Sequence, residues 1–371
     1  MKQRLRNLQF SIFSFQSLFI VILLFPSISF SQSVAAFTDY RGYFQVFDKG
    51  IFQQIEYLPV KSFTVGGNAV AYIDNTNEFQ IYYNGQKYHQ VYAADAFNYF
   101  VSDNVVVYTV GSVATVFENG KTQKVSYFAN KIFLSDSLVG YFDDSNYNLG
   151  VYYNSSPVEL ESSLLQAPQS VKVGSNTMAY VNQSGYFKIF YQGKIVDVDN
   201  TAPVTFATGR DVVAYIDGYN KYFHLFYRGQ TGQVDINQPE SFKVGFGVMA
   251  YLDFEGNFRV FSEGATRRLL SVKPDFYDVK GNMIIYGYNS EFRAFYGGQS
   301  VLIEDGIPTE YKLTNDGVAY IDVDNVLKFF YKGKSYTVSH ETVNKYFVNN
   351  EVVWYQVGNN TWKVFYDGKN Y

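Results

Sequence analysis

Acidic residues recur along the chain at multiples of about 35 residues, each at the end of a short apolar run. They are Asp39, Asp74, Asp143, Asp217, Asp253 and Asp322, and Asn182 takes the same place once. One interpretation is a ring of carboxylates that binds a hard cation or a basic partner, because both bind oxygen ligands of this kind. The other interpretation is a structural role, since an Asp side chain at the start of a turn accepts hydrogen bonds from the turn backbone. Because the repetition is regular, we favour the structural role.

A basic residue follows several of these acids after six or seven positions. Asp253 with Arg259 and Asp322 with Lys328 are the clearest pairs. If the two residues of a pair lie on adjacent strands of a hairpin, their charges face each other and contribute about 0.2–1 kcal/mol per pair. We therefore expect these pairs to stabilise hairpins.

Residues that usually bind metals or carry catalysis are scarce. The chain has three histidines at unrelated positions and no cysteine, which leaves a zinc site without support. Two oxygen-rich stretches, residues 143–146 and 322–325, do not continue into an EF-hand pattern. GxSxG, P-loop and dinucleotide-binding fingerprints are also missing from the sequence. We therefore predict no catalytic residues, no cofactor and no metal.

A sequence repeat positions all of these residues. Its first anchor is aromatic and recurs every 33–39 residues, and its second, usually glycine, follows 12–14 residues later. Agreement of two anchor sets over ten units identifies a repeat protein. The first anchors are Phe37, Tyr72, Tyr108, Tyr141, Tyr180, Tyr215, Tyr251, Tyr286, Tyr320 and Tyr355.

Each unit is predicted to contain four short strands, which we name a to d. In the second unit they cover residues 62–65, 69–74, 79–83 and 87–91. Strand b is almost continuously apolar, as expected when both of its faces are covered, whereas strand c alternates. The c–d link is a variable residue followed by glycine. This tolerance favours a type I turn with a glycine bulge over a type I′ turn.

Three short links and one long link per unit are what a β-propeller requires, because the long link crosses from the outer strand of one blade to the inner strand of the next. Residues 34–371 resemble β-propeller repeat proteins, and they are similar to the TolB and WD40 propellers in architecture only. We predict an all-β propeller of about ten four-stranded blades.

The first unit lacks strand a and the last lacks most of strand d, and these two gaps do not complement each other. An open superhelical array of the same blades is therefore the alternative.

Residues 1–31 are predicted to be an export signal. Three basic residues precede an apolar run, and Ser29-Phe30-Ser31 places small residues at −3 and −1 for cleavage before Gln32. This ending resembles those of exported proteins of the Bacteroidetes type. The alternative, an uncleaved anchor, would need a longer apolar core. We expect a single repeat domain over residues 32–371, periplasmic or extracellular and not inserted in a membrane.

Removal of the signal takes away three basic residues and no acidic one, which changes the formal net charge from −4 to −7. An acidic protein is a poor match for nucleic acid, whose recognition needs a basic face. We therefore expect no nucleic-acid partner.

The b–c and d–a links of a propeller share one face, and in this chain they carry aromatic residues among Asp and Asn. Such amphipathic side chains suit recognition of a protein or a glycan. The predicted function is therefore a non-enzymatic binding or scaffolding module. The predicted binding residues are Tyr40, Arg41, Tyr147, Tyr186, Tyr219, Tyr222, Phe254 and Tyr288.

The alternative function is a propeller hydrolase or lyase acting on polysaccharide or peptide, with a carboxylate pair assembled from distant blades. Such a pair would depart from the repeat. The clearest departures are Arg210-Asp211, Arg267-Arg268 and His340-Glu341, and none of them supplies it.

Overall fold

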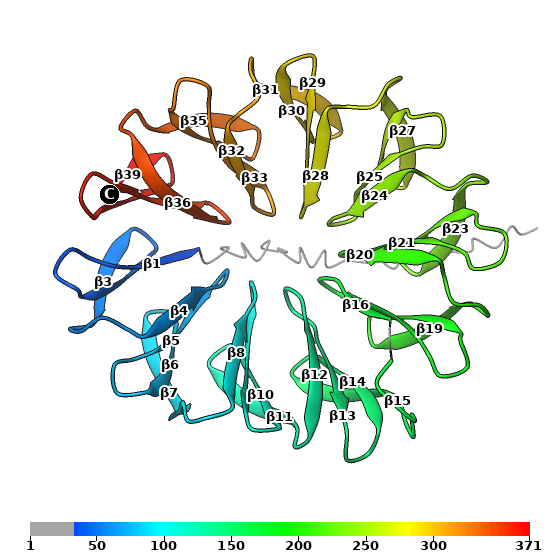
Figure 1. Cartoon of the computed structure of the whole chain (residues 1–371), viewed down its shortest axis with the longest axis horizontal. Coiled ribbons are helices and arrows are strands. Elements are labelled where there is room, and N and C mark those ends of the chain that lie inside the picture. The colour runs from blue at the N-terminus through cyan, green and yellow to red at the C-terminus, as the bar shows by residue number, and fades with distance from the viewer. Residues whose placement is uncertain (1–32, 169) are drawn as a thin grey trace, which may run out of the picture. The chain divides into compact units, whose positions relative to one another are not determined.

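The computed structural model describes residues 33–168 and 170–371, and the predicted export signal lies outside these ranges. The described residues form ten antiparallel sheets, arranged as the blades of a closed ring (Figure 1). Nine sheets have four strands and the first has three. Neither range contains a helix, so neither contains a helix that is able to span a membrane. The fold is a ten-bladed β-propeller, which confirms the predicted class and excludes the open array.

Strand a lies nearest the centre of the ring and strand d at its rim (Figure 1). Blade one contains β1–β3, blade two β4–β7, and so on to blade ten with β36–β39. The a strands are β4 (Ser62–Val65), β8 (Phe97–Val101), β12 (Ala129–Leu134), β16 (Val171–Val173), β20 (Thr205–Thr208), β24 (Ser241–Val244), β28 (Phe276–Lys280), β32 (Glu310–Leu313) and β36 (Val343–Asn349). The b strands are β1 (Val34–Thr38), β5 (Ala69–Ile73), β9 (Val105–Val110), β13 (Val139–Asp143), β17 (Thr177–Val181), β21 (Val212–Ile216), β25 (Met249–Leu252), β29 (Met283–Tyr288), β33 (Gly317–Ile321) and β37 (Val352–Val357).

The c strands are β2 (Phe44–Asp48), β6 (Glu78–Tyr83), β10 (Val113–Glu118), β14 (Asn148–Tyr153), β18 (Phe187–Tyr191), β22 (Phe223–Tyr227), β26 (Phe258–Ser262), β30 (Glu291–Tyr296), β34 (Leu327–Tyr331) and β38 (Thr361–Tyr366). The d strands are β3 (Ile51–Glu56), β7 (Gln86–Tyr92), β11 (Lys121–Ser126), β15 (Ser156–Glu161), β19 (Lys194–Asp199), β23 (Gln230–Asp235), β27 (Ala265–Leu270), β31 (Gln299–Glu304), β35 (Lys334–Ser339) and β39 (Lys369–Asn370). The last d strand has only two residues, as the sequence predicts.

The c–d turns differ from the prediction. In blade two, Tyr83 pairs with Gln86, so the loop has two residues, and both Asn84 (φ 48°) and Gly85 (φ 76°) have positive φ. Positive φ at both central residues defines a type I′ turn, whose twist matches that of the flanking strands. The other nine blades show the same pair of positive φ values, even where the first residue is Lys or Arg. The predicted type I turn with a glycine bulge is therefore wrong.

Aromatic contacts between neighbouring blades form the core. Phe44 of strand c in blade one lies 5.1 Å from Phe63 of strand a in blade two and 5.1 Å from the anchor Tyr72, measured between ring centroids. Such contacts add about 0.5–1.5 kcal/mol each beyond the area that they bury. The same triad recurs as Phe79–Tyr99–Tyr108, Phe187–Phe206–Tyr215, Phe223–Phe242–Tyr251, Phe258–Tyr277–Tyr286 and Phe292–Tyr311–Tyr320.

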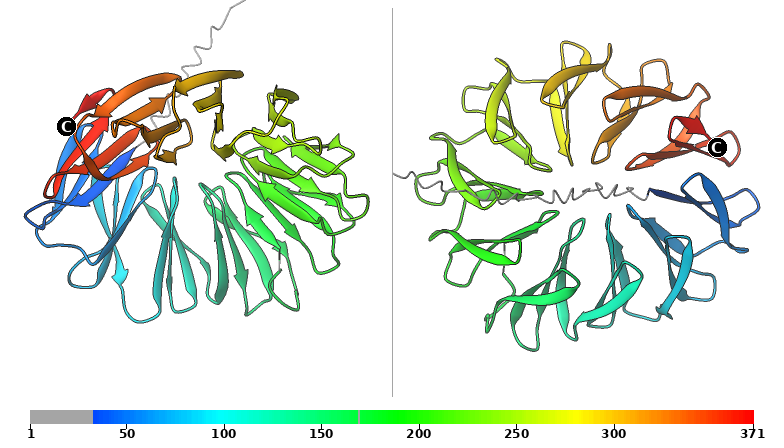
Figure 2. Two further views of the ribbon diagram at one scale, coloured as in Figure 1. Left: turned by 45° about the horizontal axis from the view of Figure 1, so that its top comes forward. Right: turned by 180° about the vertical axis from the view of Figure 1, so that it is seen from behind.

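Side-chain packing closes the ring between blades one and ten, which lie next to each other in both views of the ring (Figure 2). One apolar cluster contains Phe37 and Phe47 of blade one and Trp354 of blade ten. Phe37 stacks on Trp362 of blade ten with 5.3 Å between ring centroids. Closure therefore needs no strand shared between the two blades.

A belt of hydrogen bonds joins the a–b turns, which lie at the end of the strands opposite the b–c links. The backbone N–H of Asn68 donates to the carbonyl of Asp103 (3.1 Å), and that of Asn104 donates to Asp136 (3.0 Å). Gly66 is required here, because a Cβ atom at this position would lie 2.1 Å from the carbonyl oxygen of Ser102. The belt fixes the spacing of the inner strands.

Candidate functional site

The recurring aspartates are turn caps. Asp74 Oδ1 accepts hydrogen bonds from the backbone N–H groups of Thr76 (2.8 Å) and Glu78 (2.9 Å). Asp322 accepts equivalent bonds within its own turn, and so does Asn182 through its amide oxygen. The structural role predicted for these residues is confirmed.

The two predicted charge pairs are also confirmed. Arg259 Nε lies 2.5 Å from Asp253 Oδ2, and Lys328 Nζ lies 2.9 Å from Asp322 Oδ2. Burial acts to raise the pKa of Asp253, but the hydrogen bonds from Arg259 and Asn257 bring that pKa below its usual value. Residues 33–168 and 170–371 contain no group of three or more His, Cys, Asp or Glu side chains placed to hold a metal ion.

The eight predicted binding residues all lie at the b–c links or strand ends beside them, in blades one, four, five, six, seven and eight. Tyr40 and Tyr219 are the most exposed of them, at 76% and 83%. The structure distributes these residues around the ring and does not bring them into one pocket. Arg41 is engaged by Asp39, 3.0 Å away, and its guanidinium lies 4.7 Å from the ring centroid of Tyr43.

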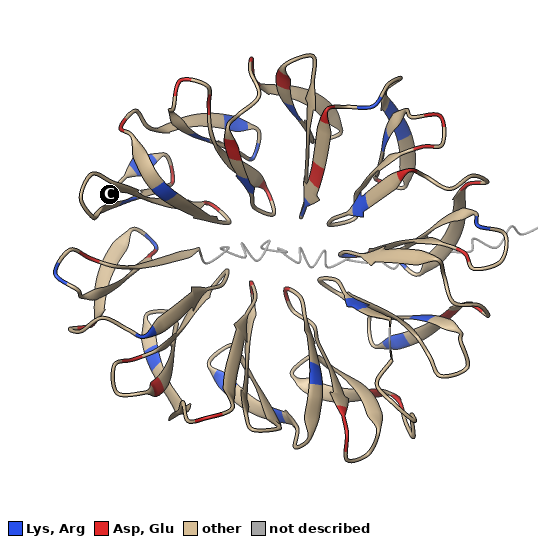
Figure 3. Ribbon diagram, viewed as in Figure 1, with Lys and Arg blue, Asp and Glu red and all other residues tan. Residues whose placement is uncertain are grey.

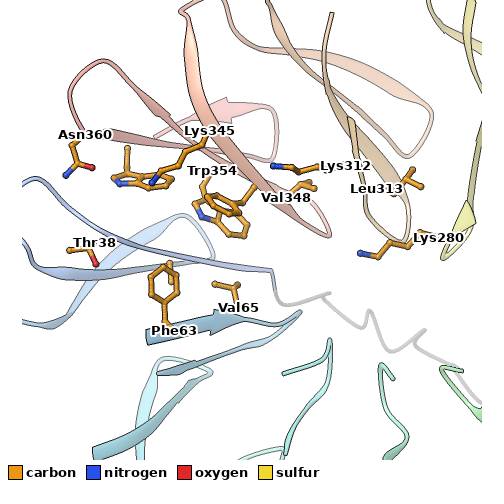
Figure 4. Close-up of a pocket in the computed structure, with 13 residues that line it drawn as sticks. Thr38, Phe63, Val65, Lys280, Lys312, Leu313, Lys345, Val348, Trp354 and Asn360 are labelled. Atoms are coloured by element: carbon orange, nitrogen blue, oxygen red, sulfur yellow. The ribbon is translucent and has the colours of Figure 1, made fainter. Parts of the chain in front are cut away.

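A cavity of about 840 Å³ lies at the seam between blades one and ten. Figure 4 shows side chains from β36, β37 and β32 on one side of it and side chains from β4 on the other. None of the eight predicted binding residues lines it. Its wall is formed by Ala36, Thr38, Phe63, Val65, Lys280, Lys312, Leu313, Lys345, Phe347, Val348, Trp354, Asn360 and Trp362.

The wall combines aromatic rings with positive charge. It includes both tryptophans of the chain and three lysines, but no Asp, Glu or His. Lys345 Nζ lies 5.0 Å from the ring centroid of Trp362, and Lys312 Nζ lies 3.2 Å from Glu310 just outside the wall. Basic and acidic residues are otherwise interspersed around the ring (Figure 3). A cavity of this size and lining suits a ligand with apolar or aromatic groups and negative charge.

A polar cluster at the a–b turns accounts for Arg210, one of the departures from the repeat. Arg210 donates to Ser175 Oγ (3.1 Å from Nη2), Ser175 Oγ donates to Asp136 Oδ2 (2.7 Å), and the Arg210 guanidinium lies 3.8 Å from the ring centroid of Phe246. Burial and the nearby charge of Asp103 raise the pKa of Asp136. These contacts join blades four to seven, so Arg210 has a structural role here.

The cavity was not predicted from the sequence, although two signals for it were present. Both tryptophans fall in the last unit, where Trp362 replaces the strand-c phenylalanine, and the first unit has no strand a. Only the ring brings these two features together.

A family model for the 10-bladed beta propeller domain matches residues 28–371. The chain belongs to this family. No curated protein matches the sequence.

Solved structures similar to this ten-bladed propeller share little sequence with it. A computationally designed protein, Ika8, is 13% identical, with a TM-score of 0.36 over 72% of this chain and 95% of its own. BamB from Moraxella catarrhalis is 12% identical, with a TM-score of 0.32 over 82% and 95%. Yeast RCC1 (Prp20), solved with Kap60, is 9% identical, with a TM-score of 0.33 over 54% and 69%. At these values the likeness concerns the fold alone.

Proposed function

We propose that this ten-bladed propeller is a non-enzymatic binding or scaffolding module of the periplasm or cell exterior, which recognises a protein or a glycan. The observation that carries the proposal is the cavity between blades one and ten. Its volume of about 840 Å³ falls within the range of ligand sites, and its wall contains both tryptophans and three of the lysines.

The composition of the wall supports binding over hydrolysis. Glycoside and peptide hydrolysis need a general acid or base, usually a carboxylate or an imidazole, within reach of the scissile bond. The cavity wall carries neither group. Its aromatic rings and lysines are of the kinds that anchor ligands by stacking and by charge.

Tyr40 and Arg41 are the predicted binding residues whose link adjoins a wall residue of this cavity. Thr38 lines the cavity and is the last residue of β1, so the β1–β2 link with Tyr40 begins directly after it. Asn360, also in the wall, lies in the corresponding link of blade ten. A partner larger than the cavity would therefore contact these b–c links as well.

Intrinsic tryptophan fluorescence tests the proposal directly, because both tryptophans line the cavity. The purified protein is titrated with panels of peptides and of neutral and acidic oligosaccharides. We expect one class to change the fluorescence saturably. We also expect Tyr40→Ala to weaken binding more than Tyr219→Ala. Tyr219 is similarly exposed but lies in blade six, outside the cavity. Lack of a response to both panels would count against the proposal, as would hydrolysis of a panel member.

Cell fractionation tests the location separately. We expect the mature protein in the periplasmic or culture-medium fraction, with an N-terminus at Gln32. Recovery of the full-length chain from the cytoplasm would contradict this part of the proposal.

A further inference from the structure

The cavity lies where blade one would have its inner strand. In the nine other blades, strand b pairs with a strand a on its inner side, whereas β1 pairs only with β2. No strand within the described residues pairs with the inner edge of β1. Antiparallel pairing directs the backbone groups of alternate residues to opposite sides. In the register that the repeats share, the backbone N–H and C=O groups of Ala36 and Thr38 therefore face the inner side. Both residues line the cavity.

A side chain from blade ten replaces one contact of the missing strand. In seven blades the carbonyl of the residue three before the anchor accepts a backbone hydrogen bond from the a–b turn, as Ala69 does from Gly66 (2.8 Å). The equivalent carbonyl in blade one is that of Val34, and there the side-chain amide of Asn349 donates instead, at 3.1 Å. The edge is thus capped at one end, and the cavity extends along the part that remains.

The a strands of the nine other blades indicate which side chains fit this position. The residue of strand a that pairs with the anchor is aromatic in seven of the nine blades, and the residue two positions later is apolar in eight. The aromatic side chain packs on the strand-c ring of the preceding blade, as Phe63 does on Phe44. For blade one that ring is Trp362. The contact from its own anchor is present, since Phe37 stacks on Trp362 at 5.3 Å, but no strand a within the described residues supplies the second contact.

The charge of the wall adds a further preference. Lys280 and Lys345 have no carboxylate within ion-pair distance among the described residues, and Lys312 is held by Glu310 and by the carbonyl of Tyr346 (2.6 Å). Neighbouring a strands already form charge pairs of this kind, since Lys243 of blade seven lies 2.9 Å from Asp278 of blade eight. An acidic side chain on an occupant of the cavity would meet lysines in the same way.

We propose that the cavity binds an extended segment of a partner protein, which adds to β1 as the inner strand of blade one. This inference rests on the proposed binding function and names its ligand. The segment runs antiparallel to β1, as in other cases of strand addition to a free sheet edge. It carries an aromatic residue opposite Phe37, an apolar residue two positions later, and acidic residues beside the aromatic one.

A peptide built from the protein itself provides the probe. Residues 309–314 of blade nine contain the required pattern, with Glu310 before Tyr311 and Leu313 two positions after it. The peptide is synthesised with Lys312→Asp, so that acidic residues flank the tyrosine, and binding is followed by tryptophan fluorescence. We expect saturable binding, and weaker binding of a matched peptide with Lys at both acidic positions.

N-methylation of the peptide separates strand addition from other modes of binding. In blade nine, Glu310 pairs with Ile321 and Lys312 with Ala319, at the register positions of Thr38 and Ala36. Methylation of the amide at position 310 or 312 should lower the affinity by about tenfold or more, because it removes a donor that faces β1. Methylation at 311 or 313, where the amide faces away, should change the affinity by less than about threefold.

Protein variants complete the test. Lys345→Glu should weaken binding of the acidic peptide and strengthen that of the lysine peptide. The control Lys131→Glu makes the same charge change on strand a of blade four, outside the cavity, and should alter neither. If a peptide binds at the cavity with equal sensitivity to all four methylations, the strand docking is wrong while the binding function stands. If no peptide binds and an oligosaccharide does, the docking is again wrong. If neither class of ligand binds, both proposals fall.

Discussion

The side-chain amide of Asn315 donates a hydrogen bond of 2.7 Å to Asp103 Oδ2. Asn315 lies in the a–b turn of blade nine and Asp103 in that of blade three, so the bond joins turns of blades that are not neighbours. The a–b ends of the inner strands therefore converge across the centre of the ring. The cavity lies along the same inner strands, and its wall residues Lys280 and Leu313 are the last residues of β28 and β32, directly before the a–b turns of these blades.

Cysteine crosslinking tests this convergence, because the natural chain has no cysteine. In a variant with Asp103→Cys and Asn315→Cys, a short thiol-specific crosslinker should join the two positions, giving an intramolecular product that migrates faster on a denaturing gel. The control pair is Asn176→Cys with Asn315→Cys, which places the first thiol in blade five. Equal crosslinking of the two pairs, or none in either, would contradict the geometry of the closed ring.

The fold was predictable from the sequence because it depends on local, repeated chemistry. Tyr72 and its equivalents recur at the same place in every unit, and the buried b strands that carry them read as apolar runs. The turn type was not predictable in the same way, since a Lys at φ 47°, as in Lys332, looks unfavourable until the twist of the hairpin is considered. The two-residue loop length imposes that conformation on whichever residue is present.

The candidate site was harder to predict, because it depends on two blades that meet only when the ring closes. Blade one has no strand a among the described residues, and in blade ten Trp362 replaces the strand-c phenylalanine. Thr38 and Trp362 are separated by more than 300 residues, and only ring closure places them around one cavity. The predicted binding residues were chosen from b–c links, where the repeat exposes aromatic side chains. Exposure of that kind is shared by many blades, so it does not single out one place on the ring.

Gly150 is expected to be intolerant of a side chain. A Cβ atom at this position in β14 would lie 2.4 Å from Cζ of the buried anchor Tyr141, which pairs with Gly150 across the hairpin. Gly150→Ala should lower the free energy of unfolding by about 1–3 kcal/mol, because the ring has to shift in a packed core. Urea unfolding followed by circular dichroism measures this change.

Gly232 provides the matched control for this variant. It also lies in a strand, β23, but a Cβ atom there would meet no atom within 4 Å. Gly232→Ala should be neutral or stabilising by up to about 1 kcal/mol, through the lower entropy of the unfolded chain. Equal destabilisation by both variants would show that the contact with Tyr141 is not the cause.

The type I′ turns lead to a stabilising substitution. Lys332 has φ 47° and precedes Gly333 in the turn between β34 and β35. Asn adopts positive φ more easily than Lys, so Lys332→Asn should raise the free energy of unfolding by a few tenths of a kcal/mol, up to about 1. Lys334→Asn, two residues later and within β35, is the control and should not stabilise. The prediction is wrong if the two substitutions have the same effect in urea unfolding.

The aspartates that cap the b–c turns should make the fold sensitive to acid. Burial acts to raise the pKa of Asp322, but hydrogen bonds from Lys328 and from the backbone of Val326, with the charge of Lys328, lower it below the usual value of 3.8. A carboxyl whose pKa is lowered in the folded state stabilises the protein above its unfolded pKa, and this contribution is lost as the pH falls through the folded value. Stability should therefore fall steeply below about pH 4.

The Asp322→Asn variant tests the contribution of this one carboxylate. It should be less stable than the parent at pH 7 by about 1–2 kcal/mol, because Lys328 loses one of its two charged acceptors and keeps only Glu304. Its deficit should shrink towards pH 2, where the parent carboxyl is itself protonated. A deficit that stays constant from pH 7 to pH 2 would mean that the charge of Asp322 does not contribute.

The buried tyrosine anchors predict an alkaline transition, with the opposite sign. Burial is the main cause that raises the pKa of Tyr141 and of Tyr251 from the usual value of 10.0 to about 12. A group whose pKa is raised in the folded state stabilises the protein below its unfolded pKa, and this contribution is lost as the pH rises from that value to the folded one. Unfolded chains release these protons near pH 10, whereas the folded ring retains them, so stability should decline between about pH 10 and 12. Absorbance at 295 nm during alkaline titration should rise in two steps, first for the exposed tyrosines, then for the anchors together with loss of the β-sheet circular dichroism. In Tyr251→Phe the first step should be unchanged and the second reduced. Ionisation of all tyrosines in one step near pH 10, with the sheet signal intact, would contradict the burial of the anchors.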